Sequence, residues 1–286
     1  MATIGVVLLG LFSAVAVTPA RAAYHDPNSE FYVALGGSAS VGWQPTAAKP
    51  GGQPTDTGYA NDLAETERSN WVDLRLVQLG CPGETTTTML DGGSHCPYRS
   101  GSQLAAATAF LRRHPSTVLL TVDLGFNDVV RCMKHQQVDQ ACVAQALEVV
   151  REQLPQILSS LRAAGGSSLQ IVGVGHYDPY LADYRQGGAA RAFSSESLTV
   201  ITQLDDVMRS AYSAAGVPMA DVASAFQTAS TEPTELDGTG VVPRNVAEAC
   251  ALTWMCAAAP FGPNPHPNDP GYRAISDAIS SLVTDR

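Results

Sequence analysis

Four polar side chains that are common in catalytic sites stand at comparable places along the sequence. Ser38, Asn127 and His176 each come one or two residues after a glycine that ends a short apolar segment. His266 lies in a proline-rich stretch just before the last amphipathic segment. If the apolar segments are strands of one parallel sheet, their carboxyl ends meet at one edge and bring these side chains together.

A serine, a histidine and nearby amide groups are suited to acyl transfer. The serine hydroxyl becomes nucleophilic when a base takes its proton, and histidine titrates in the useful range. Backbone N–H groups beside glycines and an Asn side chain can stabilise the oxyanion of a tetrahedral intermediate. Ser38 is not part of a G-x-S-x-G elbow, and the sequence has no G-x-x-x-x-G-K-[ST] or H-E-x-x-H motif. The α/β-hydrolase elbow, P-loop and zincin interpretations are therefore excluded.

The spacing of apolar residues predicts alternating strands and helices. Apolar or alternating runs typical of strands lie at 31–35, 74–79, 118–124, 169–174 and 217–222. Longer amphipathic runs predict helices at 102–113, 143–164, 194–215 and 271–283. We expect a loop over 43–59 and irregular structure over 228–262. The alternation predicts a three-layer α/β/α sandwich with a mostly parallel five-stranded sheet, in a single domain over 23–286.

The composition excludes some classes of protein. The 286 residues are 45% hydrophobic and 15% charged, with a formal net charge of -10. This balance supports a large core and argues against intrinsic disorder. Lys49 and Lys134 are the only lysines. We expect no nucleic-acid partner, because such proteins cluster cations against the phosphate backbone.

The N-terminal segment has the character of an export signal. A short apolar run from Ile4 to Val17 is followed by Pro19-Ala20-Arg21-Ala22, a small-x-small pattern suited to signal peptidase. The run is too short to span a bilayer comfortably. It differs from the usual signal peptide because no Lys or Arg precedes it. We predict a signal peptide over 1–22, cleavage after Ala22 or Ala23, and a secreted protein without a stable membrane span.

The cysteines agree with an oxidising compartment. They fall as three sequential couples, and pairing between neighbours is the simplest of the 15 possible patterns. The couples are Cys81 with Cys96, Cys132 with Cys142, and Cys250 with Cys256. Zinc binding is the weaker alternative, because the sequence contains no C-x-x-C. Each bridge would stabilise the fold by roughly 2–4 kcal/mol.

In four ordered segments the sequence resembles the SGNH (GDSL-type) hydrolases. The segments are Gly36-Gly37-Ser38, Leu79 to Thr86 with Gly83 inside it, Gly125-Phe126-Asn127-Asp128, and His266-Pro267-Asn268 leading to Gly271-Tyr272. The three cysteine couples resemble those of the secreted actinobacterial esterases and lipases. The resemblance implies a flavodoxin-like fold and a carboxylic ester hydrolase that needs no metal or organic cofactor. Its substrate would be a small-molecule or lipid ester, and we expect a monomer.

The same resemblance assigns roles to particular residues. It makes Ser38 the nucleophile and His266 the general base. The backbone N–H groups of Ser38 and Gly83, with the Asn127 side chain, would form the oxyanion hole. Gly80 is an alternative to Gly83 as the backbone donor.

Two positions depart from the family pattern. Gly37 stands where the family usually has aspartate, a residue that supports the turn. Pro263 stands where the D-x-x-H motif would have aspartate, so the usual acid beside His266 is missing. We expect a Ser38–His266 dyad oriented by the backbone carbonyl of Pro263, with the Asn264 side chain as the less favoured alternative. A neutral partner stabilises an imidazolium less than a carboxylate does, so we expect a modest turnover number.

Two further residues are candidates for substrate contact. His176 follows a predicted strand at the catalytic edge, although a structural role for this histidine fits equally well. Trp254, between Cys250 and Cys256, could form a wall of the acyl pocket or serve packing. Two rival functions use the same fold: an exported lipid- or glycan-binding protein without turnover, and an acyltransferase that uses the same serine.

Overall fold

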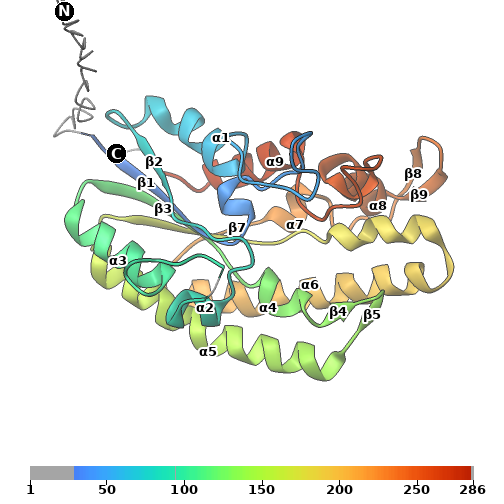
Figure 1. Cartoon of the computed structure of the whole chain (residues 1–286), viewed down its shortest axis with the longest axis horizontal. Coiled ribbons are helices and arrows are strands. Elements are labelled where there is room, and N and C mark those ends of the chain that lie inside the picture. The colour runs from blue at the N-terminus through green and yellow to red at the C-terminus, as the bar shows by residue number, and fades with distance from the viewer. Residues whose placement is uncertain (1–28, 94, 285–286) are drawn as a thin grey trace, which may run out of the picture.

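The structure, a computed structural model, describes residues 29–93 and 95–284, so the predicted signal peptide and its cleavage site lie outside the described residues. A five-stranded sheet forms the centre of this part (Figure 1), and its strand order is β2-β1-β3-β6-β7 with every neighbouring pair parallel. Its strands are β1 (Phe31–Gly36), β2 (Arg75–Gln78), β3 (Thr117–Asp123), β6 (Gln170–Val174) and β7 (Met219–Ala220). The order is that of flavodoxin-like sheets, in which sites form beyond the carboxyl ends of the strands.

Helices cover both faces of the sheet, which confirms the predicted three-layer α/β/α architecture (Figure 1). One face carries α2 (Thr86–Asp91), α3 (Gln103–Arg113), α4 (Phe126–Val130), α5 (Gln140–Gly165) and α6 (Gly188–Ala214). The other carries α1 (Tyr59–Thr66), α7 (Val222–Ala225), α8 (Arg244–Leu252) and α9 (Asp269–Ser280). Short 3-10 helices are η1 (Ala39–Val41), η2 (Glu67–Ser69), η3 (Pro179–Gln186) and η4 (Trp254–Cys256).

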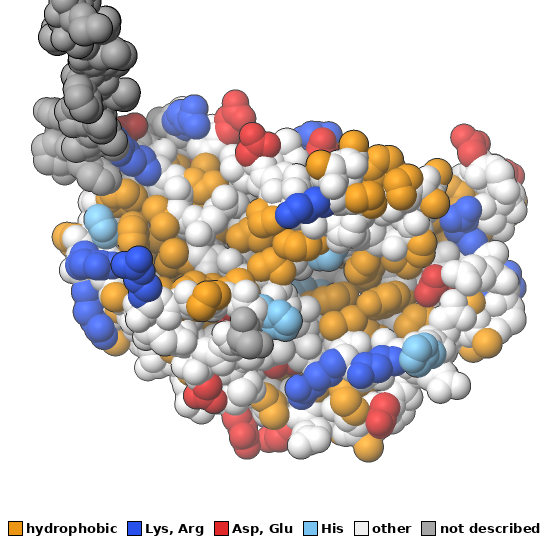
Figure 2. All heavy atoms as spheres, in the orientation of Figure 1, with side chains coloured by type: hydrophobic (Ala, Val, Ile, Leu, Met, Phe, Trp, Pro, Cys, Tyr) orange, Lys and Arg blue, Asp and Glu red, His pale blue; other side chains and the backbone are white. Residues whose placement is uncertain are grey.

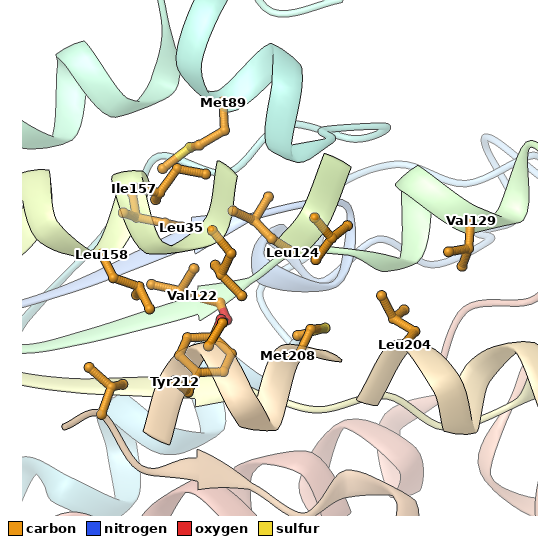
Figure 3. Packing of buried hydrophobic residues seen from close by; sticks show 14 of the residues in the cluster. Leu35, Met89, Val122, Leu124, Val129, Ile157, Leu158, Leu204, Met208 and Tyr212 are labelled. Carbon is orange, nitrogen blue, oxygen red and sulfur yellow. The ribbon is translucent and has the colours of Figure 1, made fainter. Parts of the chain in front are cut away.

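The two faces of the sheet bury separate apolar cores, because successive strand residues point to opposite sides. Leu35 and Val122 point to the side of α5 and α6, where Ile157, Leu158 and Tyr212 surround them (Figure 3). On the opposite side, a second cluster joins Tyr32 and Ala34 of β1 to α1 and α9. Strands that are buried on both faces read as unbroken apolar runs, which is why β1 and β3 were recognisable in the sequence.

The region that we expected to be irregular, residues 228–262, contains regular structure. It forms a short antiparallel hairpin of β8 (Pro233–Leu236) and β9 (Gly240–Pro243), followed by α8 and η4. The hairpin strands are short and exposed or half-buried except at Val242, so they lack the buried periodicity that marks a strand in sequence. A second small hairpin pairs β4 (Met133–Lys134) with β5 (Gln137–Val138).

The predicted cysteine pairing is confirmed. Disulfides join Cys81 to Cys96, Cys132 to Cys142, and Cys250 to Cys256, and no cysteine is free. The first ties down the segment after β2, the second closes the β4–β5 hairpin region, and the third joins α8 to η4. Within residues 29–93 and 95–284, no helix is long and apolar enough to cross a membrane.

Candidate active site

Ser38 stands immediately beyond the carboxyl end of a central strand. Gly36, the last residue of β1, has φ +124°, and a Cβ there would lie 1.9 Å from the carbonyl oxygen of Asp123. Only glycine permits this close approach of β1 to β3. The Gly37 N–H donates to the same Asp123 carbonyl at 2.9 Å, and the chain then turns through η1. The sheet therefore fixes the backbone on which the serine is carried.

A buried glutamine holds the end of β1 from the side. The Gln103 side chain accepts a hydrogen bond from the Gly36 N–H at 2.6 Å and donates to the Gly36 carbonyl at 3.1 Å. It also donates to the Glu84 carboxylate at 3.0 Å. Gln103 is the first residue of α3, and its contacts connect the serine turn (Gly36 to Ser38) to the segment that follows β2.

His266 is carried by a loop that is hydrogen bonded to the segment around Trp254. The Trp254 N–H donates to the His266 carbonyl at 3.0 Å, and the Asn264 N–H donates to the Trp254 carbonyl at 3.2 Å. Thr253 and Pro267 form an isolated antiparallel bridge. The loop ends where the Asn268 side chain accepts from the Gly271 N–H and caps α9. No strand of the sheet carries this histidine.

The structure brings the serine and the histidine into contact. Ser38 Oγ lies 2.8 Å from His266 Nε2, and His266 Nδ1 lies 2.7 Å from Asn264 Oδ1. Asn264 Oδ1 also accepts the His266 backbone N–H at 3.1 Å, which identifies this atom as the amide oxygen. Since an amide oxygen can only accept, Nδ1 carries the proton and Nε2 is free to accept the serine proton.

The expected partner of His266, the Pro263 carbonyl, is not the group at Nδ1. Pro263 is exposed, whereas Asn264 is buried. Asn264 precedes the histidine by two residues, and its side chain bonds the backbone two residues ahead in an Asx turn. That turn leaves Oδ1 directly beside the imidazole. The less favoured alternative of the sequence, Asn264, is therefore the residue in contact.

Burial keeps the imidazole neutral. Desolvation lowers the pKa of His266 from 6.5 to about 4. A neutral orienting amide does not oppose this shift in the way that a carboxylate would. The histidine is thus an unprotonated base throughout the weakly acidic and neutral range.

Asn127 lies beside the serine turn, on the first residues of α4. A Cβ placed on Gly37 would lie 2.9 Å from Asn127 Nδ2, so the family's aspartate would displace this amide. Nδ2 also donates to the Glu84 carbonyl at 3.0 Å. The adjacent Asp128 accepts from the N–H and hydroxyl of Thr86, which joins α4 to α2. Gly37 thus gives Asn127 the room to approach the serine turn.

Gly83 is less closely associated with the Ser38 cavity than the other candidate residues. It is exposed, has φ +82°, and borders a small pocket beside the Cys81–Cys96 disulfide. It is not among the residues that line the cavity next to Ser38. A Cβ on the alternative, Gly80, would lie 1.8 Å from Ser40 Oγ, so this glycine serves close packing. The oxyanion role of Gly83 stays a prediction.

A cavity of about 160 Å³ opens beside the dyad. Ser38, Asn127 and His266 line it together with His176, while its other walls are largely apolar. Hydrophobic side chains also gather around a hollow on the face shown in Figure 2. Trp254 is not one of the lining residues; its Nε1 donates to the Gln44 side chain at 3.0 Å. The aromatic ring beside His266 is Trp43, with centroids 6.3 Å apart.

Two residues of the site, Gln103 and Asp123, were not found by sequence reasoning. Gln103 and Asp123 act through contacts between distant elements, and no local pattern marks them. Asn264 was only the less favoured alternative in the sequence, although an asparagine two residues before a histidine can form an Asx turn.

Comparison with known proteins identifies the family. The model of the GDSL-like lipase/acylhydrolase family matches residues 34–274, and the chain belongs to this family. The resemblance seen in the sequence is thereby confirmed, and family membership supports an ester hydrolase. A comparison with curated proteins finds no match.

Solved structures share the fold. The chain is similar to an extracellular lipase from Streptomyces rimosus, with 19% identity, a TM-score of 0.57, and coverage of 89% of this chain and 100% of that one. It is also similar to phospholipase A1 from Streptomyces albidoflavus NA297, with 18% identity, a TM-score of 0.55, and coverage of 89% and 99%. At these identities the likeness establishes the fold alone.

Proposed function

We propose that this chain is a secreted esterase that hydrolyses carboxylic esters through a Ser38–His266 dyad. The observation that carries the proposal is the 2.8 Å contact between Ser38 Oγ and His266 Nε2, with the imidazole held in the tautomer that accepts a proton. Membership in the GDSL-like lipase/acylhydrolase family agrees with it.

In the first half of the reaction, Ser38 Oγ attacks the ester carbonyl carbon. Its proton passes to His266 Nε2, and the carbonyl oxygen becomes an oxyanion. The Asn127 amide and the Ser38 N–H donate to this oxyanion, with the Gly83 N–H as a further donor. When the intermediate collapses, the C–O bond to the alcohol breaks, and His266 returns the proton to the departing oxygen.

In the second half, water replaces the alcohol. His266 Nε2 takes a proton from the water as it attacks the acyl-serine carbonyl, and a second oxyanion forms at the same place. When this intermediate collapses, the bond between the acyl carbon and Ser38 Oγ breaks, His266 returns its proton to Oγ, and the carboxylic acid is released. Neither step uses a metal or an organic cofactor.

Asn264 orients the base through both steps. Its Oδ1 accepts the Nδ1 proton and so keeps the Nε2 lone pair directed at Ser38. An amide stabilises the imidazolium formed in each transition state less than a carboxylate does. We therefore expect a modest turnover number together with activity that persists into acid.

Three observations support secretion. The Cys81–Cys96, Cys132–Cys142 and Cys250–Cys256 bridges are typical of an oxidising compartment. The predicted signal peptide over 1–22 agrees with them, and one fold relative is named as an extracellular lipase. Signal cleavage, a single mature domain over 23–286 and the monomeric state belong to this proposal.

Ester hydrolysis by wild type and Ser38→Ala tests the proposal. We expect wild type to hydrolyse short-chain nitrophenyl esters, and Ser38→Ala to lose at least about 10³-fold in kcat, because dyad members act as a unit. Ser195→Ala, at an exposed serine of α6, is the matched control and should retain activity. Near-normal hydrolysis by Ser38→Ala, or none by wild type, contradicts the proposal.

A further inference from the structure

Two buried polar side chains at the cavity have no part in the proposed reaction. Asp123 ends β3, and His176 follows β6, so both stand at carboxyl ends of neighbouring strands. Both line the same cavity as Ser38 and His266. Asp123 is 7% exposed and His176 is 5% exposed. Polar groups buried this deeply require hydrogen-bond partners.

The imidazole of His176 is fixed so that one nitrogen remains unpaired. Its backbone N–H donates to Asp205 Oδ1 at 3.0 Å, and its Nε2 lies 2.8 Å from the Leu124 carbonyl. A carbonyl can only accept, so Nε2 carries the proton and Nδ1 presents a lone pair. No group of residues 29–93 or 95–284 hydrogen bonds to Nδ1. Burial lowers the pKa of His176, which keeps the ring neutral.

The Asp123 carboxyl group can form further hydrogen bonds inside the same cavity. Its one partner in the described chain is the Ser40 N–H, and no side chain there donates to it. Burial raises the pKa of Asp123, while the neighbouring His176 lowers it. A carboxyl group with a single partner can still accept from, or donate to, a bound hydroxyl.

The remaining walls of the cavity are largely apolar, with the rings of Tyr59, Tyr177 and Tyr180 among them. Leu124, Phe126, Val130, Val174 and Ile275 contribute to them. The volume of about 160 Å³ is close to that of a cavity that holds one benzene molecule, so only a short chain fits. A plain hydrocarbon chain would satisfy these walls but would leave the polar groups of Asp123 and His176 without partners.

We propose that this cavity selects esters whose short buried portion carries a hydroxyl group, which hydrogen bonds to Asp123 and to Nδ1 of His176. The inference rests on the proposed esterase function and narrows its substrate class to esters of short hydroxy acids or of short polyols. Both kinds of ester present a hydroxyl group to the cavity. In esters of hydroxy acids the acyl side enters the cavity, and in esters of polyols the alcohol side enters it. Sites that hydrogen bond a substrate hydroxyl discriminate strongly against analogues that lack it.

Matched ester pairs test the proposal on the wild-type protein. One arm compares ethyl butyrate with the ethyl esters of 2-, 3- and 4-hydroxybutyrate, and the other compares propyl butyrate with the butyrate monoesters of propanediols and glycerol. We expect kcat/KM for the best hydroxylated ester of one arm to exceed that of its plain partner at least about tenfold. If no hydroxylated ester in either arm exceeds its partner by threefold, the proposal is wrong.

Two variants connect the preference to the named residues. In His176→Phe and in Asp123→Asn, the ratio of kcat/KM for the hydroxylated and plain esters should fall at least about fivefold below the wild-type ratio. The ratio is measured on one preparation, so a partly unfolded sample does not change it. His114→Phe, in the aromatic stack with Phe110, and Asp206→Asn, on an exposed face of α6, should keep the wild-type ratio. An unchanged ratio in both cavity variants contradicts the proposal.

Failure of this inference is distinguishable from failure of the esterase function. Hydrolysis of plain esters that is abolished in Ser38→Ala, without any hydroxyl preference, leaves the esterase function and removes the selectivity. Absence of hydrolysis of every ester in both arms removes the esterase function itself.

Discussion

The two partners of the dyad are held in place by different kinds of structure. Ser38 stands at the end of β1, where Asp123 of the neighbouring strand and the buried Gln103 fix the backbone. His266 stands on a loop that is held by the Trp254 segment, by its own Asx turn and by the cap of α9. Ser38 is thus anchored directly to the sheet, whereas the position of His266 depends on local contacts outside the sheet.

This difference has a consequence for how each partner responds to change. The central strands of a sheet are among the last parts of a domain to open, while loops open locally at lower free energy. Changes at the serine turn should alter the oxyanion geometry itself. Changes in the histidine loop should alter the protonation or the alignment of the base and leave global stability largely intact.

Between the serine turn and the histidine loop, the largest effect is expected at the serine turn, from Gly37→Asp. This substitution restores the family's usual residue, but its Cβ would lie 2.9 Å from Asn127 Nδ2 and displace the amide. Loss of one oxyanion donor costs about 10²–10³-fold in kcat. We expect a decrease of this size, measured by steady-state hydrolysis of a nitrophenyl ester. Gly51→Asp, where a Cβ would meet open space, is the control. Unchanged kcat in Gly37→Asp would mean that Asn127 does not need the room that Gly37 leaves.

A smaller effect is expected in the histidine loop from Asn264→Ala. Without Oδ1 the Nδ1 proton loses its acceptor and the imidazole can rotate away from Ser38. Removing the carboxylate of a full triad costs about 10⁴-fold, and a neutral partner contributes less. We expect kcat to fall about 10–10²-fold. The melting temperature should change little, because a substitution in a loop disturbs the structure only locally. A loss of less than threefold would mean that the Asx turn does not orient the base.

The pH profile distinguishes a neutral hydrogen-bond partner of His266 from a charged one. Since His266 acts as a base when unprotonated, kcat/KM should fall only as pH decreases through the pKa of about 4. In Asn264→Asp the new carboxylate favours the imidazolium, so the acid limb should move to higher pH. Gln203→Glu adds the same charge on an exposed face of α6 and should leave the limb in place. A wild-type limb near the ordinary histidine pKa of 6.5 would contradict the lowered pKa of His266.

The smallest effect is expected from the disulfide beside the histidine loop. Replacing Cys250 and Cys256 with Ala should lower the free energy of unfolding by about 2–3 kcal/mol, as should the same change at Cys132 and Cys142. Only the first pair joins α8 to η4, which carries the Trp254 contacts of His266. We expect a few-fold decrease in kcat for that pair alone, measured under conditions where both variants are folded. If both double variants lower kcat equally, the Cys250–Cys256 disulfide has no specific role in positioning the histidine loop.

Much of the fold was predictable from the sequence because the sheet is buried. The strands at 31–35, 118–124 and 169–174 are apolar runs that end at glycines, and the structure has β1, β3 and β6 there. Helix starts were less accurate. The helix expected from 194 begins at Gly188, because its first turn is rich in small residues and lacks a strong apolar stripe.

The contact between Ser38 and His266 was predictable and its surroundings were not. Ser38, Asn127 and His266 belong to ordered family segments, and the structure brings them to one cavity. The group at Nδ1 of His266 is the Asn264 side chain and not the expected Pro263 carbonyl, because the loop forms an Asx turn at Asn264. Gln103 and Asp123 reach the site through pairings of distant elements, which no local spacing encodes.

Labelling with a fluorophosphonate tests most directly whether the dyad activates Ser38. Intact-mass analysis of the oxidised protein should show a single adduct on wild type and none on Ser38→Ala. The labelling rate should decline only near pH 4, as the neutral His266 becomes protonated. No adduct on folded wild type, or an adduct that persists in Ser38→Ala, would contradict the dyad as the source of activity.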